Sequence, residues 1–267
     1  MTRFCLSEEL WSLIEPLLPE PGPKLVAGRP RVPDRQALCG ILFVLHTGIQ
    51  WEYLPQELGF GSGMTCWRGL AEWNEAGVWD QLYLVLLEEA AVGEEAGLVE
   101  GGDRLLPRAG GPAGPKSGPS PVDRARPGSK HHVLVDGQGI PLAVSLTGGN
   151  RNDVTQLLPL LDKVPAVAGV VGRPRRRPNM VLADRGYDHD KYRRLLWQRG
   201  IRPAIAERGR PHGTGLGISR WVVERTISWL HGVRRLRIRW ERRDDIHEAF
   251  LGLATCLITY RHVQRLC

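Results

Sequence analysis

Two acidic residues in the second half of the sequence have surroundings suited to phosphodiester chemistry. Asp184 directly follows the short apolar segment Met180–Ala183. An apolar run of this length predicts a buried strand, so the Asp184 carboxylate should emerge at the carboxyl end of a sheet, where ligands gather in open α/β folds. Glu224 lies in the segment Arg220–Leu230, whose apolar residues predict an amphipathic helix anchored in the core.

The two carboxylates are of the kind that binds divalent metal ions. Mg²⁺ prefers oxygen ligands and usually takes one or two protein carboxylates, and two such ions can activate an attacking hydroxyl and stabilise a leaving oxygen. Arg220 and Glu224 are four residues apart and share a helix face, so Arg220 could contact a phosphate. The structural alternatives are a turn or cap role for Asp184 and a surface salt bridge of little energy for the Arg–Glu pair.

These residues belong to a predicted α/β region. Alternating and apolar segments predict strands at His131–Val135, Ile140–Leu146, Met180–Ala183 and Ile201–Ala206. Helices are predicted at Asp153–Val164, from Asp188 to Arg199, at Ser219–Leu230 and at Asp244–Arg261, with Asp153 and Asp188 as capping residues.

The first 90 residues are predicted to be helical. Ser7 and Asp34 are expected to cap the first two helices, and further helices are expected at Thr65–Ala76 and Val78–Glu89. A short helix after Trp51, a glycine-rich turn and a longer helix match the order of a helix-turn-helix. This region is acidic, so a packing or dimerisation role is an equal alternative to DNA reading.

Charge is distributed unevenly along the 267 residues. The net charge of +7 combines −9 for residues 1–100 with +16 for residues 101–267. A basic half of this size predicts a polyanionic partner such as nucleic acid; a solvated basic surface in an arginine-rich protein is the alternative. The candidate phosphate contacts are Lys130, Arg173, Arg175, Arg176, Arg177, Arg220, Arg234, Arg235, Arg237 and Arg239.

Other residue types make simpler predictions. His131 and His132 follow Lys130 at a strand start and are expected to form a basic strand edge rather than a metal site. Trp197, Trp221, Trp229 and Trp240 are expected in the core or half-buried on helices. The five cysteines form no CxxC pair, which favours reduced thiols in a soluble, cytoplasmic protein with no membrane partner.

Three segments together resemble the catalytic domain of DDE-type insertion-sequence transposases. They are GPSPVDRARPGSKHHVLVDGQGIPLAVSLTGGNRNDVTQLLPLLD, VLADRGYDHDKYRRLLWQRGI and RWVVERTISWLHGVRRLRIRWERRDDIHEAFLGLATCLITYRHV. The earlier segments LWSLIEPLLP, GRPRVPDRQALCGILFVLHTGIQWEYLP and CWRGLAEWNEAGVWDQL resemble the helical domain that precedes it in that group.

This resemblance implies a fold, a cofactor and partners. The expected fold is an α/β, RNase H-like catalytic domain (129–267) after an all-α, helix-turn-helix-like domain (1–90), with an irregular segment between them (91–128). The resemblance implies a site of two Asp and one Glu for Mg²⁺ or Mn²⁺, in which Asp184 matches the second Asp and Glu224 the Glu. It also implies binding to terminal inverted repeats and target DNA, as a homo-oligomer on the nucleoid.

The sequence departs from the family at three places. Gly217 and His231 stand where related groups have a Tyr and a Lys or Arg. The family's first Asp should lie on a strand at a fixed distance before Ser117-Gly118-Pro119, and that distance leads here to Arg104, within a segment rich in Gly, Pro and Leu.

One explanation for the missing Asp is a pair of compensating frameshifts across residues 90–116. Codons permitted for Leu98–Ala109, shifted by one base, read Trp-Ser-Arg-Ala-Val-Ile-Asp-Ser-Ser-His-Val-Arg, which is the strand that the family expects. The alternative is that Asp103 or Glu100 replaces the lost Asp. Without a third carboxylate and its strand we expect metal binding to fail and the core to be weakened.

We therefore predict a transposase that cuts the 3′ ends of an insertion element and joins them to target DNA. Its activity would be lost if the first carboxylate is truly absent. The alternatives are a non-catalytic DNA-binding relic or regulator and, less favoured, an RNase H-like nuclease or resolvase that acts on branched or hybrid substrates.

Overall fold

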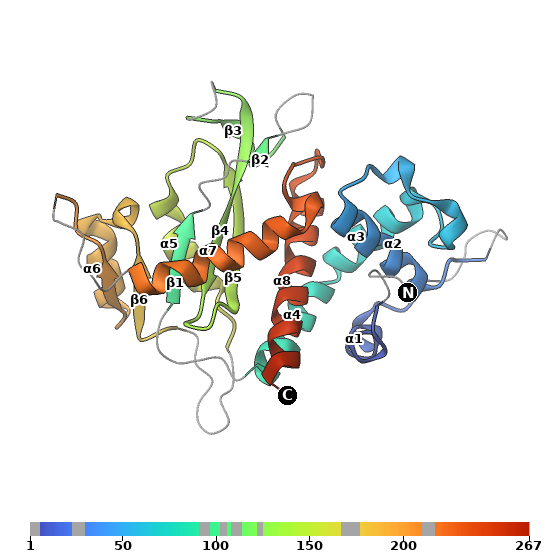
Figure 1. Cartoon of the computed structure of the whole chain (residues 1–267), viewed down its shortest axis with the longest axis horizontal. Coiled ribbons are helices and arrows are strands. Elements are labelled where there is room, and N and C mark those ends of the chain that lie inside the picture. Colours follow the sequence, from blue (N-terminus) through green and yellow to red (C-terminus); the bar gives the residue numbers. More distant parts are fainter. Residues whose placement is uncertain are drawn as a thin grey trace.

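The computed structural model describes residues 6–22, 30–90, 97–101, 106–107, 114–121, 125–166, 177–209 and 217–266. A helical region comes first and a mixed α/β region follows (Figure 1). This arrangement confirms the predicted fold class. In the described part of the chain, no helix combines the length and the apolar character needed to cross a membrane.

The helical region contains four α-helices and three 3₁₀ turns among the described residues. Their bounds are α1 Glu8–Ile14, η1 Glu15–Leu17, α2 Asp34–Thr47, η2 Trp51–Tyr53, η3 Gln56–Leu58, α3 Gly63–Glu75 and α4 Val78–Glu89. Ser7 caps α1 as predicted, because its side chain accepts a hydrogen bond from the Leu10 amide at 3.2 Å. The prediction that Asp34 caps α2 is wrong: Pro33 is the cap, and Asp34 is the first helical residue, where its charge favours the helix dipole.

Among the described residues, the α/β region is built on one seven-stranded sheet. The strands are β1 Gly97–Gly101, β2 Leu106–Pro107, β3 Gly118–Pro119, β4 Pro127–Val135, β5 Pro141–Gly148, β6 Met180–Ala183 and β7 Arg202–Ile205. β1 pairs antiparallel with β4 on one side and parallel with β6 on the other. β7 continues the sheet in parallel beyond β6, and β5 forms an antiparallel hairpin with β4.

The segment predicted to be irregular contributes to this sheet. β2 pairs with β4 at Ser129 and Gly128, and β3 pairs with β4 at Gly128 and Pro127. β4 therefore starts at Pro127, four residues before the predicted strand, and β1 occupies the central position whose strand the sequence did not predict. Such short pairs need only the backbone C=O groups and the N–H groups of the non-proline residues, so a Gly- and Pro-rich segment forms them without any apolar repeat that would predict them.

Helices cover the two faces of the sheet. α5 Leu157–Lys163 and α6 Asp190–Gln198 share a core with Leu134. The helices α7 Gly217–Gly232 and α8 Asp244–Leu266 share a different core with Val133 and Val135. Alternate residues of β4 thus point to opposite faces, as strand geometry requires. The 3₁₀ turns of this region are η4 Asp153–Gln156, η5 Arg185–Tyr187 and η6 Arg234–Leu236.

The start of α6 differs from the prediction. The helix begins at Asp190 with His189 as its cap, so the prediction that Asp188 caps it is wrong. Asp188 instead accepts hydrogen bonds from Arg193 Nε at 2.8 Å and from the Arg208 amide at 2.7 Å. The Arg208 amide and the Arg193 guanidinium lower the pKa of the Asp188 carboxyl. Asp188 therefore ties α6 to the segment after β7.

α8 joins the helical region to the sheet. It packs against α3 and α4 on one side and against β5 and α7 on the other, and Figure 1 shows it between the sheet and helices α1–α3. One hydrophobic cluster runs from Leu10 and Leu38 through Phe250 and Ala254 of α8 to Val133 of the sheet. The two regions therefore share a single core.

Two arginines predicted to contact phosphate lie inside this fold, and those predictions are wrong. Arg235 and Arg239 are 2% and 0% exposed. The Arg235 guanidinium is bound to the Glu241 carboxylate and donates to the Ile49 carbonyl at 2.6 Å, which links η6 to the helical region. Arg239 Nη1 donates to Ser129 Oγ at 2.9 Å. Both guanidinium groups bind partners in the interior, so they are not available at the surface for phosphate contact.

We expect Arg235→Ala to destabilise the protein strongly. Removing one member of a buried ion pair leaves Glu241 as an uncompensated charge, which costs about 3–5 kcal/mol. The neighbouring variant Arg234→Ala is the matched control, since Arg234 is exposed and a surface change costs about 0.5 kcal/mol or less. The free energy of unfolding in urea would be measured for both. An equal decrease in the free energy of unfolding for both variants would show that the buried Arg235–Glu241 pair stabilises the fold no more than an exposed arginine does.

Candidate active site

Asp184 lies immediately beyond the carboxyl end of β6, as the sequence predicted. Its side chain is exposed and its Oδ1 accepts a hydrogen bond from the Gly186 amide at 2.8 Å. That bond starts η5 and orients the carboxylate. Because β6 is parallel to β1 and β7, the ends of these three strands meet at one edge of the sheet, and Asp184 is at that edge.

Glu224 lies on the solvent-facing side of α7. The helix buries Val222, Val223 and Leu230, and Thr226 Oγ1 donates to the Gly139 carbonyl at 2.8 Å, which fixes α7 to the β4–β5 turn. Glu224 itself is exposed. α7 packs against β1 and β4 and crosses the sheet (Figure 1). β1 is therefore the element that touches both the strand of Asp184 and the helix of Glu224.

The donor set suits a divalent cation with oxygen ligands. Asp184 and Glu224 are exposed carboxylates of the kind that Mg²⁺ takes singly or in pairs. Among the described side chains, no group of three His, Cys, Asp or Glu could hold a metal ion. The predicted substitute Asp103 lies outside the described residues, and the side chain of Arg220 lies outside them as well.

Lys130 forms an ion pair inside the fold. Its Nζ donates to Asp153 Oδ1 at 3.0 Å and to the Arg151 carbonyl at 3.2 Å, and its side chain is 14% exposed. Asp153 was predicted to cap the following helical turn, but Asn152 does so by accepting from the Val154 amide. Lys130 thus helps to close the loop after β5, and phosphate contact would require breaking this pair.

The two strand histidines are buried, so the prediction of a basic strand edge is wrong. His131 Nε2 lies 3.0 Å from His247 Nε2 of α8, and His132 Nε2 lies 2.7 Å from Thr147 Oγ1 of β5. Burial lowers the pKa of His132 to about 4, and burial with the nearby Arg239 and Arg235 lowers the pKa of His247 to about 3. These imidazoles are neutral near pH 7 and add no positive charge.

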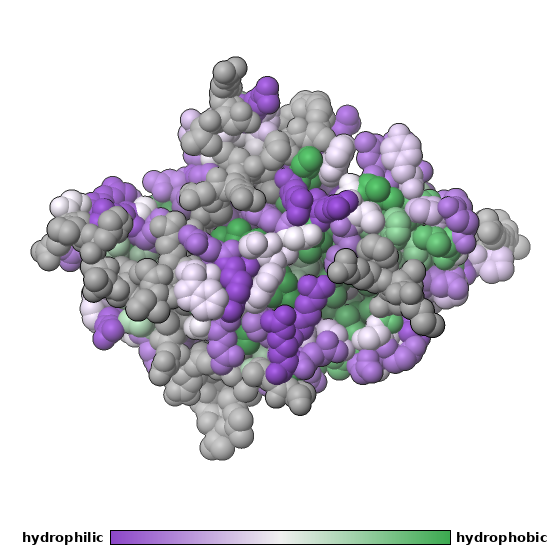
Figure 2. Space-filling view, in the orientation of Figure 1, coloured by the Kyte–Doolittle hydropathy of each residue, from purple (hydrophilic) through white to green (hydrophobic). Residues whose placement is uncertain are grey.

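A half-buried arginine and two tryptophan rings stack together on α7. The guanidinium of Arg225 lies 4.4 Å from the Trp221 ring and 4.8 Å from the Trp229 ring. Trp221 is 51% exposed, in line with the half-buried position predicted for it, whereas Trp197 on α6 is 59% exposed and therefore more open than predicted. The four-residue spacing of Trp221, Arg225 and Trp229 could have revealed this stack. Hydrophilic side chains gather over α7 and α8 in Figure 2.

The remaining basic candidates differ in how they are placed. Arg177 is exposed and donates to the Arg199 carbonyl at 2.6 Å, while Arg234 and Arg237 are exposed next to η6. Arg173, Arg175 and Arg176 lie outside the described residues.

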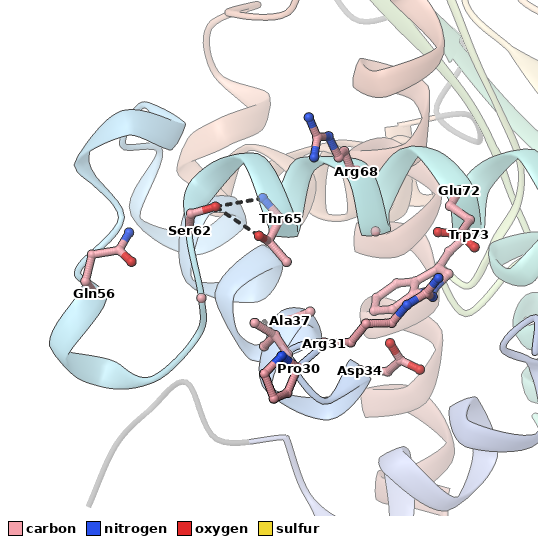
Figure 3. A pocket seen from close by; sticks show the side chains of 13 residues that line it. Pro30, Arg31, Asp34, Ala37, Gln56, Ser62, Thr65, Arg68, Glu72 and Trp73 are labelled. Atoms are coloured by element: carbon pink, nitrogen blue, oxygen red, sulfur yellow. Dashed lines mark hydrogen bonds between the residues drawn. The ribbon is translucent and has the colours of Figure 1, made fainter. Parts of the chain in front are cut away.

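The helical region has a groove of about 520 Å³ between the starts of α2 and α3. Figure 3 shows Arg31 and Arg68 in its lining together with Asp34 and Glu72. Ser62 caps α3 beside it by accepting from the Thr65 amide at 3.1 Å. The groove carries both positive and negative side chains, so its charge does not by itself favour binding of a polyanion. That this region is a DNA-binding helix-turn-helix stays a prediction.

Comparison with known proteins follows the same division of the chain. The family described as "Transposase DDE domain" matches residues 106–259. The chain belongs to this family of DDE transposases. The family described as "Putative transposase of IS4/5 family" matches residues 6–83. The α/β part is thus the RNase H-like DDE domain predicted from the sequence, and by family the chain is an enzyme of transposition.

Two proteins of Burkholderia cepacia are similar to this transposase. The "Putative transposase for insertion sequence element IS402" is 61% identical over 151 residues, which cover 57% of this chain and 72% of that protein. The "Insertion element IS402 uncharacterized 16.2 kDa protein" is 50% identical over 97 residues, which cover 36% of this chain and 66% of that protein. The two family matches leave residues 84–105, including β1, uncovered.

The buried histidine pair makes stability depend on pH. The pKa of His247 is about 3 in the folded chain against the ordinary 6.5, so the unfolded state binds more protons below about pH 6.5 and stability falls as the pH falls. Between about pH 7 and pH 4 this histidine should lower the free energy of unfolding by on the order of 2–3 kcal/mol. We expect His247→Gln to abolish that part of the pH dependence. Urea unfolding of this variant and of the control His189→Gln would measure it. A pH dependence of His247→Gln equal to that of the unsubstituted chain would contradict the prediction.

Proposed function

We propose that this transposase cuts the ends of an insertion element and joins them to target DNA by metal-dependent phosphodiester transfer. The observation that carries the proposal is the exposed Asp184 at the carboxyl end of a parallel strand in a chain of the DDE family. Glu224 supports it, because its helix crosses the adjacent strand β1. Both positions match the acidic residues that the resemblance assigns to the metal site.

Each residue has a task in the proposed reaction. Asp184 and Glu224 would hold Mg²⁺ or Mn²⁺ through their carboxylate oxygens. When bound, the ions would activate the attacking oxygen and stabilise the leaving one. In the first step water attacks the phosphorus at the element end and the 3′ oxygen leaves with a proton. In the second step that 3′ hydroxyl attacks a target phosphodiester, so one ester bond forms as another breaks.

The DNA would follow the exposed cations of the second half of the chain. Arg177 and Arg234 are exposed, Arg175 and Arg176 directly precede Arg177 in the sequence, and Arg220 belongs to α7. Phosphate contacts of this kind give affinity without sequence specificity. We include Trp221 with Arg225 in this surface, because stacked aromatic and guanidinium groups bind bases and backbone together. We further propose assembly as a homo-oligomer on the terminal inverted repeats, in association with the nucleoid.

A non-catalytic DNA-binding relic is the second candidate. It is favoured by one observation: the range 84–105, where the family's first Asp belongs, is not covered by either family match. We propose compensating frameshifts across residues 90–116 as the origin of the missing Asp. Resequencing codons 85–120 should then restore a frame that reads Val-Ile-Asp-Ser near Arg104. An unchanged reading frame would rule out the frameshift and leave the present residues as the functional ones.

Asp184→Asn and Glu224→Gln should each abolish metal-dependent nicking and leave DNA binding intact. Loss of a ligand removes several kcal/mol of transition-state stabilisation, and about 1.4 kcal/mol is tenfold in rate, so we expect a loss on the order of a thousandfold. The assay would use labelled duplexes with the element's terminal repeat, in Mg²⁺ and in Mn²⁺, and gel-shift binding. Asp190→Asn, exposed at the start of α6, is the control.

The unsubstituted chain decides between the two candidates in the same assay. Metal-dependent nicking at the repeat end supports the transposase. Binding without any nicking supports the relic. Cleavage of branched or hybrid substrates with no preference for repeat ends would instead indicate a nuclease outside transposition.

A further inference from the structure

The segment between α2 and α3 presents a surface that is both acidic and apolar. Tyr53, Leu58 and Met64 are 67%, 49% and 55% exposed. The charged residues beside them, Glu52 and Glu57, are also exposed. Large apolar side chains gathered at a surface mark contact sites for other proteins, and carboxylates repel the phosphates of DNA. These five residues, here called the acidic surface, therefore suit a protein partner.

Close packing holds this segment on α2. A Cβ at Gly63 would lie 1.9 Å from the Trp51 carbonyl oxygen, so the start of α3 directly contacts η2. A Cβ at Gly40 of α2 would lie 2.6 Å from Cys66 Sγ and 2.9 Å from Phe60 Cβ. These contacts fasten the segment through its inward-facing residues and leave the acidic surface facing solvent.

α6 carries a surface of the opposite charge. Lys191, Arg194 and Trp197 follow one another at intervals of three residues, which places them along one side of the helix. Lys191 and Arg194 are exposed, and Trp197 is 59% exposed. The helix buries Leu196 on its other side, and its one acidic residue, Asp190, is at its first position. The side formed by Lys191, Arg194 and Trp197, here called the α6 face, is therefore basic and partly apolar.

The two surfaces are complementary but cannot meet within one chain. Figure 1 shows α6 at one end of the molecule and helices α1–α3 at the other, with the sheet and α8 between them. Facing charges of opposite sign around buried aromatic and aliphatic side chains are typical of protein interfaces. The partner that fits the acidic surface is therefore the α6 face of another copy.

We propose that the acidic surface of one copy of this chain docks on the α6 face of a second copy, without DNA or metal. Glu52 and Glu57 would pair with Lys191 and Arg194, and the apolar side chains of the acidic surface would cover Trp197. The inference rests on the homo-oligomer of the proposed function and names its contact. Because each copy offers both surfaces, the contact is head-to-tail and either closes by reciprocal docking or extends to further copies.

Charge reversal on each surface tests the contact. One variant carries Glu52→Lys and Glu57→Lys, and the other carries Lys191→Glu and Arg194→Glu. Each variant alone would place like charges opposite each other, so its self-dissociation constant should rise by about tenfold or more. Sedimentation equilibrium without DNA or metal would measure the mass and the dissociation constant. Added salt should weaken association of the unsubstituted chain, because it screens the charges.

Mixing the two variants shows whether the contact lies between copies. In an equimolar mixture the new lysines face the new glutamates and the unsubstituted surfaces face each other, so association should return to that of the unsubstituted chain. This recovery also shows that both variants are folded, which thermal unfolding of each one checks directly. A control with Glu88→Lys and Glu89→Lys, exposed at the end of α4, should associate as the unsubstituted chain does.

A matched apolar pair tests the centre of the contact. Trp197→Ser should weaken association, because the ring that the acidic surface covers is lost. Leu84→Ser, on α4 where Leu84 is 38% exposed, should leave association unchanged. Equal effects of the two substitutions would contradict the proposed place of Trp197.

The outcomes separate this inference from the proposed function. Association that neither charge reversal weakens would overturn the contact and leave a homo-oligomer formed through another surface. Weakening by both variants without recovery in the mixture would overturn the pairing of the two surfaces. A chain that stays monomeric without DNA would overturn the inference outright, whereas nicking of repeat DNA tests the proposed chemistry independently.

Discussion

The simultaneous pairing of β1 with β4 and β6 is the constraint on which the rest of the α/β region depends. β4 and β5 form a hairpin, and β6 and β7 form a parallel pair; among the strands that the structure describes, β1 alone joins the two halves. A parallel pair cannot persist alone in water, because its unpaired backbone groups and apolar faces would be exposed. With β1 in place, both faces are covered and the carboxyl end of β6 becomes a defined edge that presents Asp184.

The charge of the chain is only partly available to a ligand. Arg235 and Arg239 are buried, Lys130 is paired with Asp153, and Lys116 contacts Glu248 at 2.6 Å. Cations of this kind satisfy carboxylates and carbonyls within the fold, since a buried charge is stable only with partners. Among the described residues, exposed cations remain on several elements, including Arg177 before β6, Arg194 on α6, and Arg234 and Arg237 at η6. Net charge therefore overstates the number of phosphates that the protein can contact.

α8 makes the helical region and the α/β region mechanically dependent on each other. It is packed on both sides, and Arg235 adds a polar link to the Ile49 carbonyl at the end of α2. A shift of the helical region would therefore also displace α7, because Leu230 of α7 and Phe250 of α8 belong to the same core. In the proposed function this coupling would connect DNA held by one region with the carboxylates of the other.

The sequence by itself determined the local elements and the family. Periodic apolar residues located α3, α4, β6 and β7 to within a few residues, because burial of one face imposes a repeat that can be read directly. Asp184 and Glu224 were found in the same way, from their places at a strand end and on an amphipathic helix. The family resemblance then assigned them a shared chemistry.

Only the tertiary structure decided which polar residues are buried and what the segment before residue 121 does. Arg235 looks like Arg234 in sequence, and only packing against Phe250 and Glu241 separates them. The strands β1, β2 and β3 have no apolar repeat, since their places are set by backbone hydrogen bonds to β4 and β6 that no local pattern encodes.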